Sequence, residues 1–327
     1  VAGALVAFRR RAHRPLVAAA LVALTAAQLL WLNAASPLDA EPASTYSALA
    51  TPFPDEARAV AILQGELARR HAEGARPRVE FLGVDGAWQN AAMIYGWEDT
   101  LGYNPLRMAD YSRAVGAGES STFTEMRSYP DTFRGYNSRL AALLGLEYLV
   151  LRKPIADMPR DFPRPRASLL YAGASFFLYR LDGPSVPRAF VATSLVSADA
   201  AQTMAAGSLP PYAIGRQALI EDDDAPRLAD QGLLAPDTGA PAGMARITAY
   251  ADDRVTLDVD TRQAGLVVLH DLFYPGWTAR VDGVPAPVLR ADLLFRGVEV
   301  GAGHHTVEFA FHPLSLANLA SIVRRTE

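Results

Sequence analysis

The feature that most constrains this chain is an uncharged apolar run near its beginning. Leu16–Leu32 reads LVAAALVALTAAQLLWL, 17 residues with polar groups only at Thr25 and Gln28. A helix needs about 17–25 predominantly apolar residues to cross the hydrocarbon core of a bilayer. Four arginines within Arg9–Arg14 precede the run, and positive charge marks the cytoplasmic side. We therefore predict a transmembrane helix, with the lipid bilayer as a partner and everything after about residue 35 extracytoplasmic.

A secretory signal peptide is the alternative, because such a peptide also joins a basic segment to an apolar one and ends in small residues such as Ala34 and Ala35. However, Val1–Phe8 (VAGALVAF) is itself apolar and is typical of the end of an earlier membrane span. This start favours the membrane helix. Both interpretations export the rest of the chain.

Composition excludes several classes of protein. The chain has 327 residues, 50% of them hydrophobic, which is too apolar for a disordered protein. The net charge is -4, so the whole chain offers no case for a nucleic-acid partner. Cysteine is absent, which excludes disulfides, thiolate zinc sites and cysteine nucleophiles.

The exported part reads as two domains of the α+β class. We expect a membrane segment at 1–35, a Pro/Ala/Ser-rich linker at 36–54, a mixed α/β domain at 55–233, a β-sandwich at 244–313 and a tail at 314–327.

Helical and strand periodicities alternate in the first domain. Asp55 is placed to cap a helix over 56–71, and Asn137 is placed to cap one that ends near Leu144. Two short helices are expected between Trp88 and Val115, and a further helix over 198–206. Strands are predicted at 78–82, 148–151, 168–171, 176–181 and 188–192.

After the Pro/Gly-rich stretch 234–243 only strand patterns remain. Apolar residues alternate with polar ones in 254–260 (RVTLDVD), and Asp282-Gly283 is a strong hairpin signal because both residues tolerate positive φ. Strands at 245–250, 254–260, 265–269, 277–281, 294–300 and 306–311 predict a small antiparallel β-sandwich.

One stretch resembles a known family. His270–Pro313 is similar to the C-terminal signature of YfhO-type bacterial membrane proteins, with weaker likenesses in Leu143–Leu151, Pro187–Phe190 and Gly102–Pro105. The matching motif residues, which we interpret as structural, are Tyr274, Pro275, Gly276 and Trp277, the turn Asp282 and Gly283, Phe295 and Arg296, and Gly303 with His305.

The resemblance implies the C-terminal part of a polytopic protein of the bacterial inner membrane, similar to GT-C glycosyltransferases. Such proteins transfer sugar from a polyprenyl-phosphate carrier to a cell-envelope glycopolymer. Their catalytic carboxylate is expected in an N-terminal membrane region that this chain lacks, so we assign no catalytic residue here. The family usually enters a final span after the position of Pro313, whereas Leu314–Val323 is short.

The most site-like cluster combines two carboxylates with aromatic and amide groups. A sugar donor or acceptor could contact its members, which are Tyr95, Trp97, Glu98, Asp99, Tyr103 and Asn104. Equally, the cluster could be a capped helix start packed on the neighbouring domain.

No cofactor or metal is expected. His304 and His305 are adjacent in a strand and point to opposite faces, and Glu221–Asp224 lacks the ligand spacing of a calcium loop. Trp277 could stack on a sugar ring, but filling the sandwich core is the stronger interpretation.

Two further functions stay open. The chain could be an exported module that binds glycan or is purely structural, or a secreted glycoside hydrolase that uses Glu98 or Asp99. The hydrolase needs two carboxylates roughly 5–9.5 Å apart across a cleft.

Overall fold

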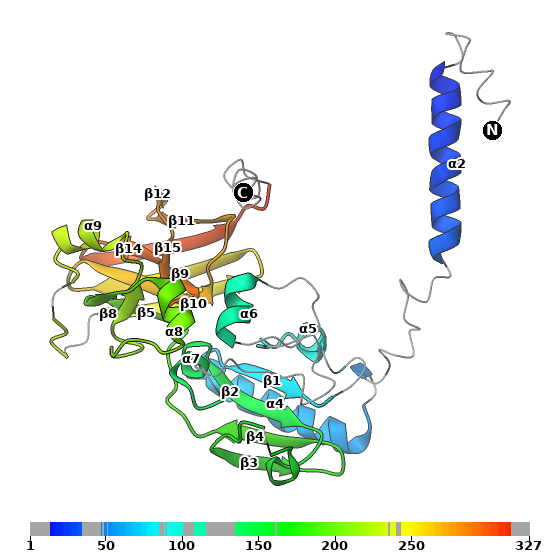
Figure 1. Ribbon diagram of the computed structural model, residues 1–327, viewed down its shortest axis with the longest axis horizontal. Coiled ribbons are helices and arrows are strands. Elements are labelled where there is room, and N and C mark those ends of the chain that lie inside the picture. The colour runs from blue at the N-terminus through cyan, green and yellow to red at the C-terminus, as the bar shows by residue number, and fades with distance from the viewer. Residues whose placement is uncertain are drawn as a thin grey trace. The chain divides into compact units, whose positions relative to one another are not determined.

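The computed structural model describes residues 14–34, 47, 49–50, 52–84, 88, 90–100, 108–115, 135–160, 162–234, 236–239 and 243–314 (Figure 1). The chain divides into two compact units, 1–52 and 53–327, which are described separately.

The first unit contains helix α2 (Arg14–Ala34), which covers the predicted apolar run. Its segment Pro15–Leu32 has a mean hydropathy of 2.0. The helix is long and apolar enough to cross a membrane, a property that it shares with signal sequences.

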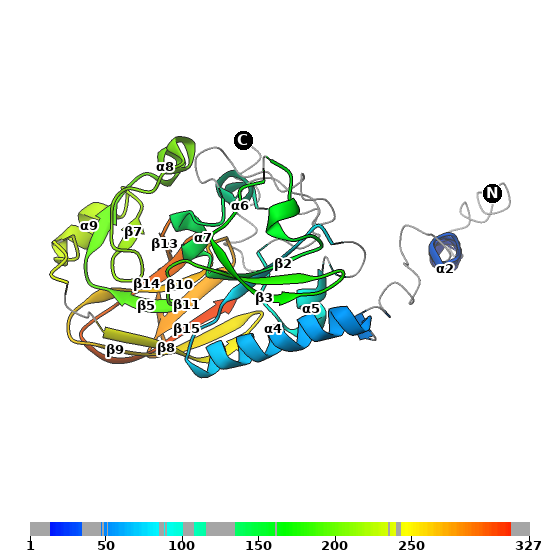
Figure 2. The same cartoon turned by 90° about the horizontal axis from the view of Figure 1, so that it is seen from below.

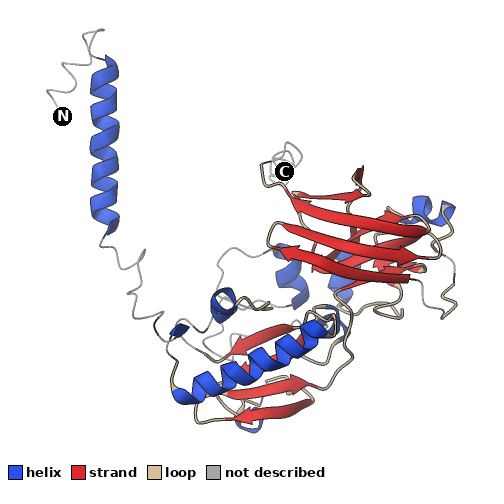
Figure 3. Ribbon diagram, turned by 180° about the vertical axis from the view of Figure 1, so that it is seen from behind, coloured by secondary structure: helices blue, strands red, loops and turns tan. Residues whose placement is uncertain are grey.

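The second unit begins with helix α4 (Pro54–Ala72) against a four-stranded sheet (Figure 3). The strand order is β1 (Arg78–Leu82), β2 (Leu146–Leu151), β4 (Phe177–Leu181) and β3 (Ala167–Ala172). Strands β1 and β2 are parallel, and the other pairs are antiparallel. The apolar face of α4 is buried, as its helical spacing predicts; its members are Ala59, Val60, Leu63 and Leu67.

The caps of two helices differ from the prediction. Phe53 occupies the N-cap of α4, and Asp55 lies in the first turn. Its carboxylate instead accepts hydrogen bonds from the Tyr171 hydroxyl at 2.7 Å and the Ser175 amide at 2.8 Å. Burial alone would raise the pKa of Asp55, but these hydrogen bonds outweigh it and hold the pKa far below its ordinary value. Asp55 therefore fastens the helix to the β3–β4 turn.

Helix α7 (Arg139–Leu143) is capped by Ser138, whose hydroxyl accepts from the Ala141 amide at 3.1 Å, and not by Asn137. The Asn137 side chain instead accepts from the Arg166 amide at 2.9 Å. Adjacent Asn and Ser both have capping propensity, so pattern alone does not separate them. Other short helices in the described part of the chain are α5 (Ala91–Tyr95), α6 (Ala109–Val115), η4 (Ile155–Asp157), α8 (Ala200–Ala206) and α9 (Ala225–Asp230).

Two more sheets follow. The six-stranded sheet has the order β5 (Ala189–Ala192), β10 (Gly265–Leu272), β14 (Phe295–Val300), β13 (Leu289–Ala291), β7 (Ala218–Ile220) and β6 (Leu195–Ser197). The five-stranded sheet has the order β12 (Val284–Ala286), β11 (Trp277–Val281), β15 (Gly303–Phe311), β9 (Arg254–Thr261) and β8 (Gly243–Ala251).

Both of these sheets contribute side chains to one buried apolar cluster. Val267 and Val298 enter it from the six-stranded sheet, and Leu257 and Phe309 enter it from the five-stranded sheet. The alternation predicted in 254–260 is confirmed, because its apolar positions are the buried ones. Asp282 and Gly283 form the predicted turn, with φ of 52° and 80°. Both angles are positive, a conformation that glycine adopts readily and aspartate tolerates.

Strand pairing crosses the domain boundary predicted at 233–244. Strand β5 pairs with β10 in the register Val191↔Val267, so β5, β10 and β14 lie side by side (Figure 2). Strands on both sides of that boundary therefore share one sheet. The loss of helical periodicity near residue 243 shows where the helices end. It does not show where the six-stranded sheet begins, because β5 of that sheet lies earlier in the chain.

The shared apolar cluster generates a stability prediction. Phe309 is fully buried in it, so Phe309→Ala should lower the free energy of unfolding by about 3–5 kcal/mol. Val284→Ala, at a position 66% exposed on β12, should change the free energy by less than about 0.5 kcal/mol. Urea unfolding of the full chain measures both, and equal losses would contradict the packing described.

Candidate functional site

Two residues of the predicted carboxylate–aromatic cluster, Glu98 and Asp99, lie along strand β1. Gly96 ends helix α5 in the left-handed conformation, with φ of 69°, and turns the chain toward the sheet. The Glu98 carbonyl then accepts from the Val79 amide at 2.8 Å, and Asp99 bridges to the same residue. Tyr103 and Asn104 lie outside the described residues.

The aromatic members of the cluster stack on one another and on the sheet. The Tyr95 and Trp97 rings are 4.5 Å apart, and Trp97 stacks on Phe81 of β1 at 5.8 Å. Partial burial raises the pKa of Tyr95 above its ordinary value. These rings are engaged in packing at one edge of the sheet, and both stay half-exposed.

Glu98 is surrounded by arginines. Its carboxylate pairs with Arg76 at 3.0 Å, with Arg78 at 3.7 Å and, through a short hydrogen bond, with Arg188. Arg188 is only 2% exposed and directly precedes β5. One of the two carboxylates that sequence analysis considered for substrate contact therefore links β1 to the six-stranded sheet.

Two of these arginines, Arg78 and Arg188, also contact a second carboxylate, Asp271 of β10. Asp271 accepts from Arg78 at 3.0 Å, from Arg188 at 3.1 Å and from Arg296 of β14 at 3.2 Å. The Tyr250 hydroxyl of β8 adds a bond at 3.0 Å. We call this set the arginine junction; its members are Arg76, Arg78, Glu98, Arg188, Tyr250, Asp271 and Arg296.

Burial and charge oppose each other in the junction. Burial alone would raise the pKa of Asp271, but the positive charges of Arg188, Arg78 and Arg296 outweigh it and lower the pKa. Burial raises the pKa of Tyr250, which keeps its hydroxyl protonated as a donor. Burial also lowers the pKa of Arg188 and Arg296. The junction is thus a set of mutually dependent charges, in which Arg296 Nε is the one buried donor without a hydrogen-bond partner among the described residues.

Several of the motif residues that resemble the family contact one another. The Arg296 guanidinium lies over the Trp277 ring at 3.6 Å, and Tyr274 contacts the edge of that ring. His305 bonds to the Asp282 carboxylate at 2.7 Å, beside Gly303. The remaining motif residues are in turn or core positions: Pro275 and Gly276 precede β11, Gly283 completes the turn, and Phe295 is buried.

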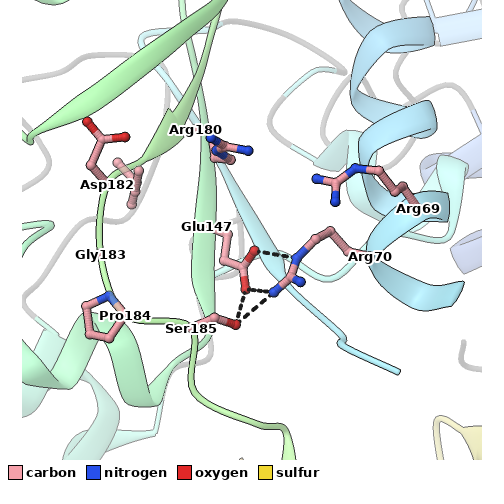
Figure 4. Close-up of a pocket in the computed structure, with 9 residues that line it drawn as sticks. Arg69, Arg70, Glu147, Arg180, Asp182, Gly183, Pro184 and Ser185 are labelled. Atoms are coloured by element: carbon pink, nitrogen blue, oxygen red, sulfur yellow. Dashed lines mark hydrogen bonds and ion pairs between the residues drawn. The ribbon is translucent and has the colours of Figure 1, made fainter. Parts of the chain in front are cut away.

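A cavity of about 560 Å³ lies elsewhere, between the end of helix α4 and strands β2 and β4 (Figure 4). Arg70 binds the Glu147 carboxylate with two nitrogens, at 2.9 and 2.8 Å. The Ser185 hydroxyl accepts from Arg70 at 2.7 Å and donates to Glu147 at 2.9 Å. We call it the α4–β4 cavity; its lining is Arg69, Arg70, Glu147, Arg180, Leu181, Asp182, Gly183, Pro184 and Ser185.

Sequence analysis missed this cavity. Its residues come from three separate segments, and none of these segments carries a local spacing typical of a ligand site. Among the described residues, no group of three or more His, Cys, Asp or Glu side chains is placed to hold a metal.

The junction generates a prediction about acid stability. Because the pKa of Asp271 is lowered in the folded protein, its contribution is present above the unfolded-state pKa of about 3.9 and is lost as pH falls through the folded value. Asp271→Asn leaves three arginines under-compensated and should lower the free energy of unfolding at neutral pH by about 3–5 kcal/mol. The variant should also lose less stability than the wild type on acidification.

Urea unfolding at neutral and acidic pH measures both effects. The matched control is Asp260→Asn, an exposed aspartate on β9, which should stay within about 0.5 kcal/mol of the wild type. An acid dependence that is unchanged in Asp271→Asn would contradict the described role of this carboxylate.

Comparison with known proteins finds no significantly similar protein. No family model matches the chain, and neither a curated protein nor a solved structure is significantly similar to it. The resemblance to YfhO-type proteins therefore stays a prediction.

Proposed function

We propose that this chain is the extracytoplasmic, membrane-anchored part of a YfhO-like polytopic protein of the bacterial inner membrane. In this role it supports the transfer of sugar from a polyprenyl-phosphate carrier to a cell-envelope polymer, and the catalytic carboxylate lies in a membrane region that precedes this chain. The β-sandwich of this proposal comprises the strands of residues 244–313, which lie in the six-stranded and five-stranded sheets.

The surroundings of Glu98 are the observation that carries the non-catalytic role. A general base has to reach the acceptor hydroxyl and exchange protons with it. Glu98 instead pairs with three arginines, of which Arg188 is almost fully buried. Protonating or moving this carboxylate would leave buried positive charge uncompensated, which favours a structural use of Glu98.

The apolar helix supports the location. Helix α2 has the length and hydropathy of a membrane span, and the arginines before it favour a cytoplasmic start. With a cytoplasmic start, a single crossing by α2 would put the second unit outside the cytoplasm.

An exported module that binds glycan without a transferase is the second candidate. The α4–β4 cavity favours it, because a cavity of this volume suits a small ligand whether or not a membrane enzyme is attached. The two candidates differ in whether sugar transfer depends on this chain.

Topology gives the first test. Reporter enzymes fused after Ala50 and after Gly243 should be active only in the form that works outside the cytoplasm, because both positions follow α2. A fusion placed before Leu16 serves as the control and should report the cytoplasm. A cytoplasmic signal after Ala50 or Gly243 would overturn the proposed orientation.

Incorporation of labelled sugar into envelope polymer gives the second test. The full-length protein should incorporate sugar, this chain alone should not, and deletion of residues 53–314 from the full-length protein should reduce incorporation at least about tenfold, or about 1.4 kcal/mol in the barrier. Turnover by this chain alone would overturn the non-catalytic role. Undiminished incorporation after the deletion would favour the independent module.

A further inference from the structure

We propose that the α4–β4 cavity binds a neutral saccharide unit. The inference deepens the supporting role in sugar transfer and rests on it for its biological setting, although binding can be measured separately. The cavity's volume of about 560 Å³ falls within the roughly 300–1,000 Å³ typical of small-ligand sites.

One wall of the cavity is held rigid before any ligand arrives. The flat guanidinium of Arg70 and the carboxylate of Glu147 form a two-point pair, and Ser185 bonds to both. Arg70 also donates to Glu73, which fixes the guanidinium from its other side. Donors and acceptors held in place in this way lose little entropy when a ligand binds.

Across from this wall, arginine donors are available to a ligand. The Arg180 and Arg69 guanidinium groups point toward one another in Figure 4. Arg69 uses one bond each to Glu66 and Glu73, which leaves some of its five N–H groups unused. Within the part of the chain that the structure describes, the Arg180 guanidinium makes no hydrogen bond, and it interacts with Glu66 through its charge.

The charge balance favours a neutral ligand. Three arginines line the cavity, whereas four carboxylates are present when Glu66 and Glu73 are counted with Glu147 and Asp182. Arg69 and Arg70 also lie in the last turn of α4, where the helix dipole disfavours anions. A phosphate or carboxylate would therefore gain little from these arginines.

The mix of groups favours hydroxyls. Each sugar hydroxyl both donates and accepts, so it can meet an arginine and a carboxylate at once. Asp182 is held through one oxygen by the Ser168 hydroxyl at 2.8 Å, while the Leu181 and Pro184 side chains are the only large apolar surfaces in the lining. An apolar ligand would leave these polar groups unsatisfied, at a cost that a polyhydroxylated ligand avoids.

The experiment measures binding of glucose, mannose, N-acetylglucosamine and maltose to the full chain in lipid nanodiscs. Nanodiscs avoid detergents with sugar head groups, and saturation-transfer NMR detects weak complexes. Arg180→Met removes the unengaged guanidinium at an exposed position and should raise the dissociation constant at least about tenfold. Arg280→Met, an exposed arginine on strand β11, is the matched control and should leave it unchanged.

Glu147→Gln is the second variant, since it keeps the shape of the wall and weakens its pairing with Arg70; it too should weaken binding. Circular dichroism checks that each variant is folded. Saturable binding of none of the four sugars would overturn the proposal. So would tighter binding of inorganic phosphate or glucuronate, or an equal effect of Arg180→Met and Arg280→Met.

The sugar-incorporation assay separates this inference from the supporting role. If the chain binds sugar but its deletion leaves transfer intact, the cavity proposal stands and the transferase role fails. If deletion abolishes transfer but no sugar binds, the role stands and the cavity proposal fails.

Discussion

The arrangement of the three sheets depends on the carboxylate of Asp271. It receives hydrogen bonds from Arg78 of the four-stranded sheet, from Arg296 of its own sheet and from Tyr250 of the five-stranded sheet. A buried charge without its partners costs several kcal/mol, so these elements are stable together only in an arrangement that satisfies all the charges at once. The junction therefore specifies geometry more than it adds stability.

The junction also connects residues that sequence analysis had considered separately. Arg296, part of the motif behind the family resemblance, bonds to Asp271 and stacks on Trp277 of another motif element. Glu98, the candidate for substrate contact, shares Arg78 and Arg188 with Asp271. One structural requirement, a shared site for buried arginines, thus accounts for residues that patterns alone could assign to function.

Local patterns predicted local structure well. The alternation in RVTLDVD identified strand β9 and its buried face, and Asp282-Gly283 identified a turn, because both signals depend only on neighbouring residues. The prediction that Asp55 caps α4 was wrong, because its carboxylate accepts hydrogen bonds from Tyr171 and Ser175, which are more than a hundred residues away in the sequence. The pairing of β5 with β10, the junction and the cavity could not be predicted, since each joins segments whose proximity a single sequence does not reveal.

Two sets of arginines and carboxylates in this protein show why residue type alone does not identify a site. In the junction, Arg188 is 2% exposed and its nitrogens bond to groups of the same chain. In the α4–β4 cavity, the Arg69 side chain is 46% exposed, and the Arg180 guanidinium has no hydrogen bond within the described part of the chain. A buried set whose guanidinium and carboxylate groups bond mainly to one another has little capacity left for a ligand, whereas an open set exchanges its water for ligand hydroxyls at little cost. By this criterion the α4–β4 cavity is the part suited to bind a ligand, and the arginine junction joins the sheets of the second unit.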